Sequence, residues 1–205
     1  MKRYKFPSIP HLPYSNSITT DDITVMELPN WDVVVTEKLD GQTICMTRDF
    51  IHARSIEDLP RAPYNDNIKR IWSELRWNIP EEYYFFGEDV SVKHSVYYNS
   101  LPSSFMVFGL MVNKRFWAWD NVKNWCEQVG LATAPELYRG VFDRNLIHQA
   151  WKPQCGDESE GYVIRPLGNF GFDYTEKYVQ KYVRANHVQD KVHWTRPPFI
   201  YNKEQ

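Results

Sequence analysis

The chain has 205 residues and a mass of 24.4 kDa, enough for one domain with a sizeable core and too little for two full ones. Apolar residues make up 42 % and aromatic residues 16 % of it, which excludes the composition of a disordered protein. Lys and Arg number 24 against 26 Asp and Glu, which excludes a basic coat for nucleic acid but not a local basic groove. No apolar run approaches the roughly 18 residues of a membrane span, so we expect no membrane partner.

The three cysteines, Cys45, Cys126 and Cys155, are odd in number, widely spaced and without a Cys-x-x-Cys pair. This pattern favours reduced thiols over a disulfide framework or a zinc site. We therefore expect a cytoplasmic protein.

The predicted elements begin after an irregular lead-in over residues 1–30, because Pro7, Pro10, Pro13 and Pro29 interrupt any long regular element. β-Branched and aromatic runs then predict short strands. In chain order, these strands cover residues 31–37, 43–47, 51–55, 83–90, 105–112, 116–119, 161–166 and 178–184.

Two helices are predicted among these strands. Asp66 caps the first, whose apolar residues recur over 68–75 at the i, i+3, i+4, i+7 spacing of one helix face. Asp120 opens the second, which covers 120–129 and stops at Gly130. Strands outnumber helices, and many follow one another directly, which favours an α+β fold with antiparallel sheets over a parallel doubly wound one.

The residues most informative about chemistry lie where the first predicted strand meets a glycine turn, in Glu37-Lys38-Leu39-Asp40-Gly41-Gln42. A lysine at the end of a buried strand is partly desolvated, which lowers its pKa and frees the amine as a nucleophile. The alternative is a solvated turn lysine, because a Lys-x-Asp-Gly tetrapeptide is common by chance.

Five further short motifs follow Lys38-Leu39-Asp40-Gly41 along the chain. They are His52-Ala53-Arg54-Ser55, Phe86-Gly87-Glu88, Phe105-Met106-Val107-Phe108-Gly109, Glu160-Gly161-Tyr162-Val163-Ile164-Arg165 and Lys181-Tyr182-Val183-Arg184. In this order, the motifs resemble the covalent nucleotidyltransferase superfamily of polynucleotide ligases and RNA capping enzymes. Within it they are most similar to the ATP-dependent RNA ligases, above all the nick-sealing phage enzymes. The resemblance implies an α+β nucleotidyltransferase (ATP-grasp-like ligase) domain of antiparallel sheets flanked by helices.

The resemblance also implies a reaction in three phosphoryl transfers. A lysine attacks the α-phosphate of ATP to give lysyl-AMP and pyrophosphate. The AMP then passes to a 5′-phosphate end, and a 3′-hydroxyl end displaces it. Such in-line transfers need mainly positioning, cations and a metal, so ATP and Mg²⁺ or Mn²⁺ are the implied cofactors.

Nucleotide-binding roles follow from the same resemblance. Lys38 would be the nucleophile, while Glu37 and Phe108 would hold the adenine. Arg54 and Glu88 would hold the ribose and the phosphate side, Glu88 by accepting from ribose hydroxyls. For Phe108 the alternative is a core position, because it lies in a strongly apolar predicted strand.

The resemblance implies that Glu160 and Lys181 complete the catalytic group with Lys38. Glu160 would hold the divalent metal, since carboxylates suit hard cations. Lys181 would neutralise the charge that develops on the α-phosphate. As an alternative, Glu88 and Glu160 could be exposed charges at strand ends.

The chain departs from the family pattern at three places. Val183 stands where a second lysine usually follows Lys181, so Arg184 or Lys177 would have to supply that cation. Gln42 stands where DNA ligases and capping enzymes usually have Arg. About twenty residues follow Lys181, which leaves no room for the OB-fold domain of those relatives. We therefore expect residues 1–205 to form a single adenylyltransferase domain of an RNA ligase, without an OB domain.

Cations and rings alternate in the last thirty residues. The stretch contains Lys177, Tyr178, Lys181, Tyr182, Arg184, His187, Lys191, His193, Trp194 and Arg196. Such alternation suits a surface that follows phosphates and stacks on bases, although a solvated charged tail is the usual explanation.

The sequence thus predicts an enzyme that joins RNA ends, at a nicked duplex or a break, as a monomer. Its compact length suggests a phage or other small-genome origin. One alternative is a minimal DNA or hybrid nick ligase, since contacts to the 2′-hydroxyl are not visible in a sequence. The other is a non-catalytic nucleic-acid-binding module of the same fold.

Overall fold

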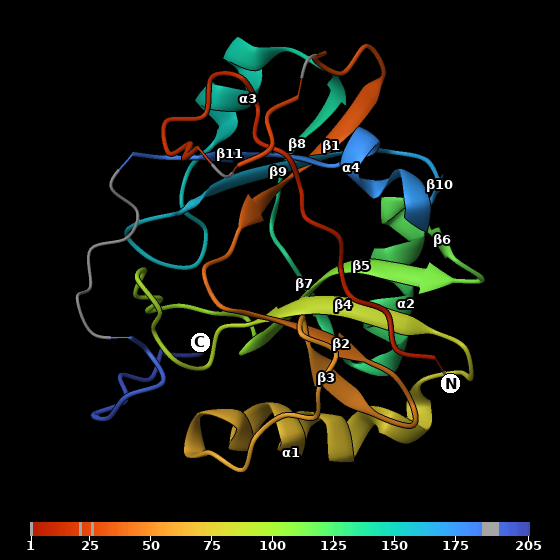
Figure 1. The fold of residues 1–205 in the computed structure, drawn as a ribbon, viewed down its shortest axis with the longest axis vertical. Helices are drawn as coiled ribbons and strands as arrows, with labels where there is room; N and C mark the ends of the chain where they lie inside the picture. The colour runs from red at the N-terminus through yellow and green to blue at the C-terminus, as the bar shows by residue number, and fades with distance from the viewer. Residues whose placement is uncertain (1, 21, 26, 186–192) are drawn as a thin grey trace.

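The computed structural model describes residues 2–20, 22–25, 27–185 and 193–205, and two facing sheets form its centre (Figure 1). Sheet A consists, in spatial order, of β11 (Gln180–Val183), β9 (Gly161–Pro166), β1 (Asp32–Lys38) and β8 (Glu136–Val141), all antiparallel. Sheet B consists of β10 (Phe170–Gly171), β6 (Arg115–Phe116), β5 (Phe105–Val112), β4 (Tyr84–Asp89), β2 (Gln42–Met46) and β3 (Ile51–Ala53). The short strand β7 (Ala132–Thr133) pairs with β5 in parallel.

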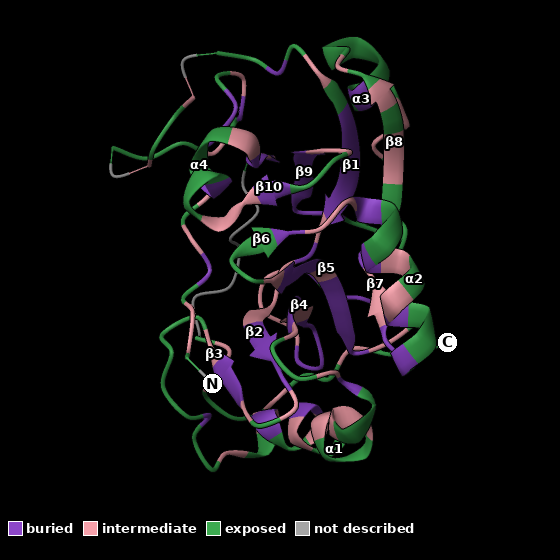
Figure 2. Ribbon diagram, turned by 90° about the vertical axis from the view of Figure 1, so that its right-hand side faces the viewer, coloured by how far each residue is buried: buried purple, intermediate pink, exposed green. Residues whose placement is uncertain are grey.

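Helices cover the outer faces of both sheets. The helices are α1 (Asp66–Leu75), α2 (Trp119–Val129), α3 (Arg144–Ala150) and α4 (Thr175–Tyr178), and single 3₁₀ turns lie at Pro63–Asn65, Arg76–Asn78 and Phe172–Tyr174. Figure 2 shows that buried residues are concentrated in strands such as β1, β5 and β9, and exposed ones on the outward sides of the helices. Among the described residues, no helix is long and apolar enough to cross a membrane.

The two-residue period of the strands divides the core into three layers. On β4, Phe85 faces the helix side of sheet B, where α1 and α2 pack, while Phe86 faces the space between the sheets. On β9, Val163 faces the same space, while Tyr162 and Ile164 face the outer side of sheet A, towards α3. The space between the sheets is therefore lined from both sides by alternate residues of several strands.

The structure confirms the predicted antiparallel α+β class and most predicted elements, with most bounds shifted by up to two residues. The strand predicted over 116–119 is wrong beyond Phe116, where β6 ends, and Trp119 begins α2. The strand 161–166 and the stop of α2 at Gly130, in the left-handed region at φ 80°, are as predicted. The last predicted strand is shorter, because Tyr178 belongs to α4. β8, α3 and the short elements β7, β10 and α4 were not predicted; β8 is an edge strand of exposed and half-buried residues without clean alternation.

The described residues of the lead-in form no strand or helix of their own, yet they are tied to both sheets. The backbone of Lys181 on β11 donates to Pro10 at 3.0 Å and accepts from Leu12 at 2.8 Å. At the other sheet, the hydroxyl of Tyr84 donates to the Lys2 carbonyl at 2.9 Å. The segment between these contacts crosses in front of the space between the sheets, as the red trace of Figure 1 shows.

The chain passes from sheet A to sheet B directly after Lys38. β1 ends at Lys38 and β2 begins at Gln42, so only residues 39–41 make the crossing. A Cβ on Gly41 would lie 2.3 Å from the Asp89 carbonyl oxygen, so only glycine allows β4 to approach this closely.

We predict that Gly161→Ala destabilises the fold, because an added Cβ would lie 2.0 Å from the Tyr182 carbonyl oxygen on β11. Urea unfolding should show a loss of about 1–3 kcal/mol in the free energy of unfolding. Gly168→Ala is the matched control, because nothing lies within 4 Å of its added Cβ. Equal stabilities of the two variants would contradict the close packing of β9 against β11.

Candidate active site

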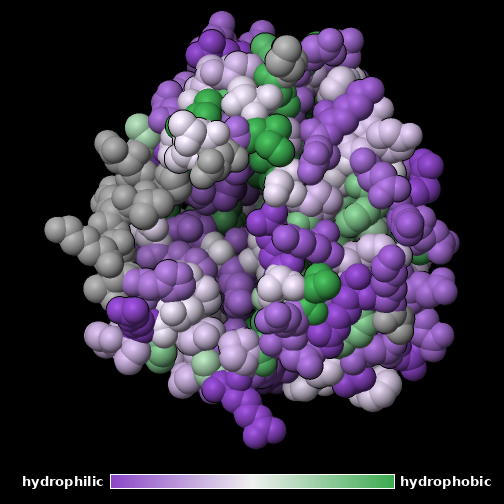
Figure 3. Space-filling model, viewed as in Figure 1, coloured by the Kyte–Doolittle hydropathy of each residue, from purple (hydrophilic) through white to green (hydrophobic). Residues whose placement is uncertain are grey.

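A pocket of about 360 Å³ lies between the two sheets. Sheet A contributes residues of β1, β9 and β11, and sheet B contributes residues of β2, β4, β5 and β6. Residues 6–9 of the lead-in and the first turn of α2 also contribute to the lining. Figure 3 shows that the surface on this side of the molecule is largely hydrophilic, with hydrophobic side chains scattered over it.

The centre of the site is an ion pair between Lys38 and Glu160. Gly161 is the register partner of Lys38, so Glu160, one residue before β9, lies beside it. Lys38 Nζ donates to Glu160 Oε2 at 2.5 Å, and only 6 % of Glu160 is exposed. Burial lowers the pKa of Lys38, but the charges of Glu160 and Glu88 outweigh it, so the pKa is raised overall. The sequence predicted a lowered pKa for Lys38, but with Glu160 as its partner the pKa is raised instead.

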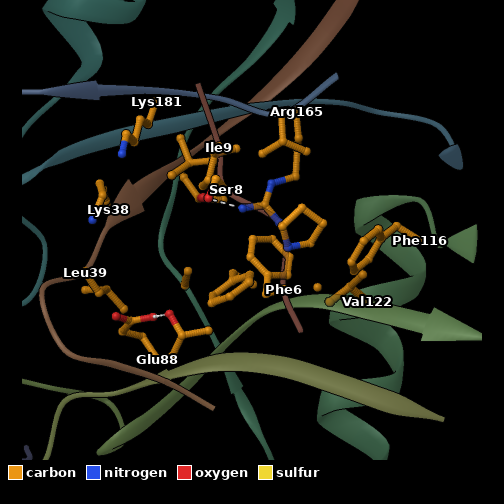
Figure 4. Close-up of a pocket in the computed structure, with 18 of the residues that line it drawn as sticks. Phe6, Ser8, Ile9, Lys38, Leu39, Glu88, Phe116, Val122, Arg165 and Lys181 are labelled. Carbon is orange, nitrogen blue, oxygen red and sulfur yellow. Dashed lines mark hydrogen bonds between the residues drawn. The ribbon is translucent and has the colours of Figure 1, made fainter. Parts of the chain in front are cut away.

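Lys181 lies beside this pair as the second cation. It is the register partner of Val163 on β9, and both residues line the pocket. Figure 4 shows its amine and that of Lys38 pointing into the same part of the pocket. Burial and then the charge of Lys38 lower the pKa of Lys181. The two amines therefore create a positive potential that would favour an anion between them.

Glu37 lies in the pocket wall with only 2 % of its surface exposed. Its Oε2 accepts from the Gln154 backbone N–H at 3.0 Å, whereas Oε1 is buried without a hydrogen-bond partner among the described residues. Burial raises the pKa of Glu37 to about 7. An unsatisfied buried carboxyl oxygen is costly, so a ligand that donates a hydrogen bond here would relieve the cost.

Glu88 faces the pocket from β4 and accepts from Thr43 Oγ1 at 3.1 Å. Burial raises its pKa to about 8, although the charge of Lys38 acts in the opposite direction. Phe108, on the neighbouring strand β5, also lines the pocket. Its ring packs edge-on against Phe6 of the lead-in, with 4.9 Å between the ring centres. The proposed adenine platform thus has a second aromatic ring beside it.

Arg54 lines the pocket but is bonded to the lead-in. Its Nε donates to the Phe6 carbonyl at 3.2 Å, and its Nη2 donates to Ser8 Oγ at 2.7 Å. In this arrangement, the guanidinium holds the lead-in in place at the edge of the pocket. A contact with ribose or phosphate, as the resemblance implies, stays a prediction.

Lys181 is the member of the alternating stretch that lines the pocket. Lys177 is exposed on α4, where its amine lies 5.5 Å from the centre of the Tyr178 ring. Arg184 binds the loop before β9, donating from Nε to the Ser159 carbonyl at 2.9 Å and pairing with Glu158. His187 and Lys191 lie outside the described residues, whereas Arg196 is described and exposed.

Arg165 is a pocket residue that the sequence analysis did not assign. Only 8 % of it is exposed, its Nη2 donates to Thr36 Oγ1 at 3.2 Å, and its guanidinium lies 5.0 Å from the centre of the Trp119 ring. Its Nε has no hydrogen-bond partner among the described residues, and burial lowers its pKa to about 10. The sequence contained a signal for Arg165, because Gly161, Val163 and Arg165 are spaced two residues apart and therefore lie on the same face of β9.

Asp22 of the lead-in also lines the pocket and was not predicted. Its Oδ1 lies 3.3 Å from Nε2 of the buried His11. Burial and then the charge of Lys181 lower the pKa of His11. No local pattern marks these two residues, because their place depends on how the lead-in attaches to β11.

The residues of the pocket fit a nucleotide better than a protein-bound metal. Two amines, a buried arginine with a free Nε and a buried carboxyl oxygen are a suitable set for phosphate and base edges. In the described part of the chain, no group of three or more His, Cys, Asp or Glu side chains could hold a metal ion. Mg²⁺ nevertheless fits, because it commonly takes one or two carboxylates, waters and substrate phosphates, and Glu160 can supply the carboxylate.

The fold is similar to that of solved ligases at low sequence identity. A mutant Naegleria gruberi RNA ligase with ATP and Mn matches with a TM-score of 0.58 and 16 % identity, over 76 % of this chain and 50 % of that one. An archaeal ATP-dependent RNA ligase matches with a TM-score of 0.51 and 14 % identity, over 76 % and 44 %. A chain from Aquifex aeolicus, provisionally named an ATP-dependent DNA ligase, matches with 0.50 and 17 %, over 75 % and 44 %.

These matches define the class of the fold as that of the nucleotidyltransferase-type ligases. The chain spans about half the length of the solved ligases that it matches. The RNA ligase family model matches residues 32–183, from the start of β1 to the end of β11. The chain therefore belongs to the RNA ligase family. No curated protein matches it significantly in sequence.

We predict that Glu37 makes the ligand-free protein less stable as the pH rises. Its carboxyl group has a pKa of about 7 in the fold against 4.5 in its ordinary state, so the folded state binds the proton more tightly. The stabilisation is complete below pH 4.5 and is lost as the pH rises to about 7, by at most about 3 kcal/mol.

Urea unfolding across this pH range should therefore show a smaller loss of stability in Glu37→Gln than in the wild type. Glu88 titrates in both proteins, so the difference isolates Glu37. Parallel pH profiles would contradict the assignment of a raised pKa to this residue.

Proposed function

We propose that this protein is an ATP-dependent RNA ligase that joins 5′-phosphate and 3′-hydroxyl ends through a lysyl-AMP intermediate. The observation that carries the proposal is that Lys38 and Lys181 line one pocket while Glu160 pairs with Lys38, although the three residues come from three regions of the chain. Membership of the RNA ligase family supports the reaction class, and the solved relatives include RNA ligases with ATP and Mn.

The first step is the transfer of AMP to Lys38. The raised pKa of Lys38 means that its ammonium must first give up a proton to water, because only the neutral amine is a nucleophile. Its lone pair then forms a bond to the α-phosphorus, and the bond from this phosphorus to the bridging oxygen breaks, releasing pyrophosphate. The nitrogen gives up a second proton to water, which leaves a neutral phosphoramidate nitrogen. Lys181 would stabilise the negative charge of that transition state.

The adenosine part would lie deeper between the sheets. Glu37 Oε1, which is buried without a hydrogen-bond partner among the described residues, would accept from an amino group of the base, and Phe108, which lines the pocket, would contact the base with its ring. Glu88 would accept from the ribose hydroxyls. Glu160 would hold a divalent cation, which supplies charge neutralisation at the phosphates when bound.

The later steps seal the nucleic acid. The phosphoramidate on Lys38 gives AMP to a 5′-phosphate, and a 3′-hydroxyl then displaces AMP to form the phosphodiester. We propose RNA as the substrate, at a nicked duplex or at broken ends, and a cytoplasmic monomer as the acting form. Lys181 and the cations after it are the proposed contacts to the phosphates.

We predict that the wild type becomes covalently labelled by ATP carrying a label in its α-phosphate. With Mg²⁺ present, the label should survive denaturation of the protein, and Lys38→Ala should show none. Lys152→Ala is the matched control, because Lys152 is an exposed lysine outside the pocket and its loss should leave labelling unchanged. A wild type that binds ATP but takes no label would identify a non-catalytic binding module.

We also predict a preference for RNA at the 3′-hydroxyl end. Nicked duplexes with an RNA 3′-hydroxyl strand should be sealed about five- to tenfold faster than those with a DNA strand, the effect of one hydrogen bond to the 2′-hydroxyl. Rates should be measured with pre-adenylylated protein, so that the first step does not enter. Equal rates would favour a DNA or hybrid nick ligase.

A further inference from the structure

The crossover after Lys38 is held by a loop that is distant in sequence, residues 90–104. The Asp40 backbone N–H donates to the Tyr98 hydroxyl at 2.7 Å. Oδ2 of Asp40 accepts from the backbone N–H groups of Ser95 and Val96 at 2.7 and 2.8 Å. The backbone and the side chain of a residue two positions after the nucleophile are thus both fixed by this loop.

Tyr98 is the most deeply buried of the loop residues that bond to Asp40. None of its surface is exposed, and its ring belongs to the core between sheet B and its helices. Burial raises the pKa of Tyr98 far above its ordinary value, so its hydroxyl stays neutral and available as an acceptor. The hydrogen bond from the Asp40 N–H is partly buried, so loss of the Tyr98 hydroxyl would leave this donor without its partner at a cost.

The loop is held in turn by residues 200–205, which lie along it. Asn202 Oδ1 accepts from the Tyr98 backbone N–H at 2.9 Å, and Asn202 Nδ2 donates to the Val90 carbonyl at 2.7 Å. The backbone of Lys203 also donates to the Tyr98 carbonyl at 2.9 Å. One asparagine side chain therefore ties Tyr98 to the start of the loop.

These contacts converge on the crossover. Asn202 holds the backbone of Tyr98, the hydroxyl of Tyr98 holds Asp40, and Asp40 lies two residues from Lys38. The contacts of Gln205 go instead to Ser100 and Leu101, away from Asp40. Within residues 200–205, Asn202 is therefore connected to the crossover through Tyr98, whereas the hydrogen bonds of Gln205 lead away from it.

We propose that Tyr98 and Asn202 are positioning residues for Lys38: they hold the crossover so that Nζ of Lys38 keeps its alignment for in-line attack. The inference rests on the proposed function, in which Lys38 is the nucleophile. In-line transfer tolerates little misplacement of the attacking atom, whereas binding of the nucleotide depends on other side chains of the pocket. Loosening the crossover should therefore slow the chemical step without weakening nucleotide binding.

The experiment compares Tyr98→Phe and Asn202→Ala with two matched controls. Tyr97→Phe removes a hydroxyl from the neighbouring tyrosine, which is 37 % exposed, and Gln205→Ala removes a side chain whose hydrogen bonds among the described residues go to Ser100. Four quantities are measured: the single-turnover rate of Lys38 adenylylation at saturating ATP, the Kd of α,β-methylene ATP, hydrogen exchange of the peptide 38–42, and the melting temperature.

Tyr98→Phe and Asn202→Ala should lower the adenylylation rate about tenfold, the effect expected for one lost hydrogen bond. They should also speed hydrogen exchange in residues 38–42, while the Kd stays within about twofold of the wild type, and the controls should resemble the wild type in all four measurements.

An unchanged rate, or unchanged exchange in residues 38–42, would overturn the proposal. So would a rate that falls only together with nucleotide affinity and the melting temperature, because that result indicates a general loss of fold. A wild type that takes no label would instead contradict the proposed function, and the positioning role would fall with it. The hydrogen-exchange measurement would then show only whether Tyr98 and Asn202 hold residues 38–42 in place.

Discussion

The structure depends on how the chain crosses from sheet A to sheet B in three residues. Gly41 permits this, because β4 passes too close for any Cβ, and Asp40 is anchored by hydrogen bonds to residues 95–98. Lys38 is thereby held at the point where the two sheets diverge, with its side chain in the space between them. The pairing of β1 with β9 then brings Glu160 beside Lys38. The position of the ion pair therefore depends on both the crossover and this strand pairing.

The charges between the sheets are costly to the fold. Lys38, Lys181 and Arg165 bring cations into a partly buried space that holds the carboxyl groups of Glu88 and Glu160. Apolar residues of similar size would commonly stabilise such a space as well or better. Perturbed pKa values caused by burial and by specific partners, gathered in one pocket, are the usual mark of a functional site rather than a structural one.

The lead-in has a structural role that its composition conceals. Its prolines prevent regular structure, but its backbone pairs with β11 and its Phe6 ring packs against Phe108 in the pocket wall. Arg54 bonds to the lead-in, so a residue implied in nucleotide binding also secures the wall of the pocket. The wall on that side is therefore an irregular segment, held by side-chain contacts more than by a continuous ladder of backbone hydrogen bonds.

The sequence by itself determined the strands with two-residue alternation, the two longer helices and seven residues assigned to the site. Six of these seven residues line the pocket, and the seventh, Glu160, pairs with Lys38. These features are local, since side-chain alternation, helix spacing and short motifs are each contained in a few neighbouring residues. Only the tertiary structure decided the raised pKa of Lys38, the partners of Arg54, the edge strand β8 and the contact of Asn202 with the 90–104 loop. Each of these depends on groups far apart in the chain, whose burial and charge act on one another only after the sheets have come together.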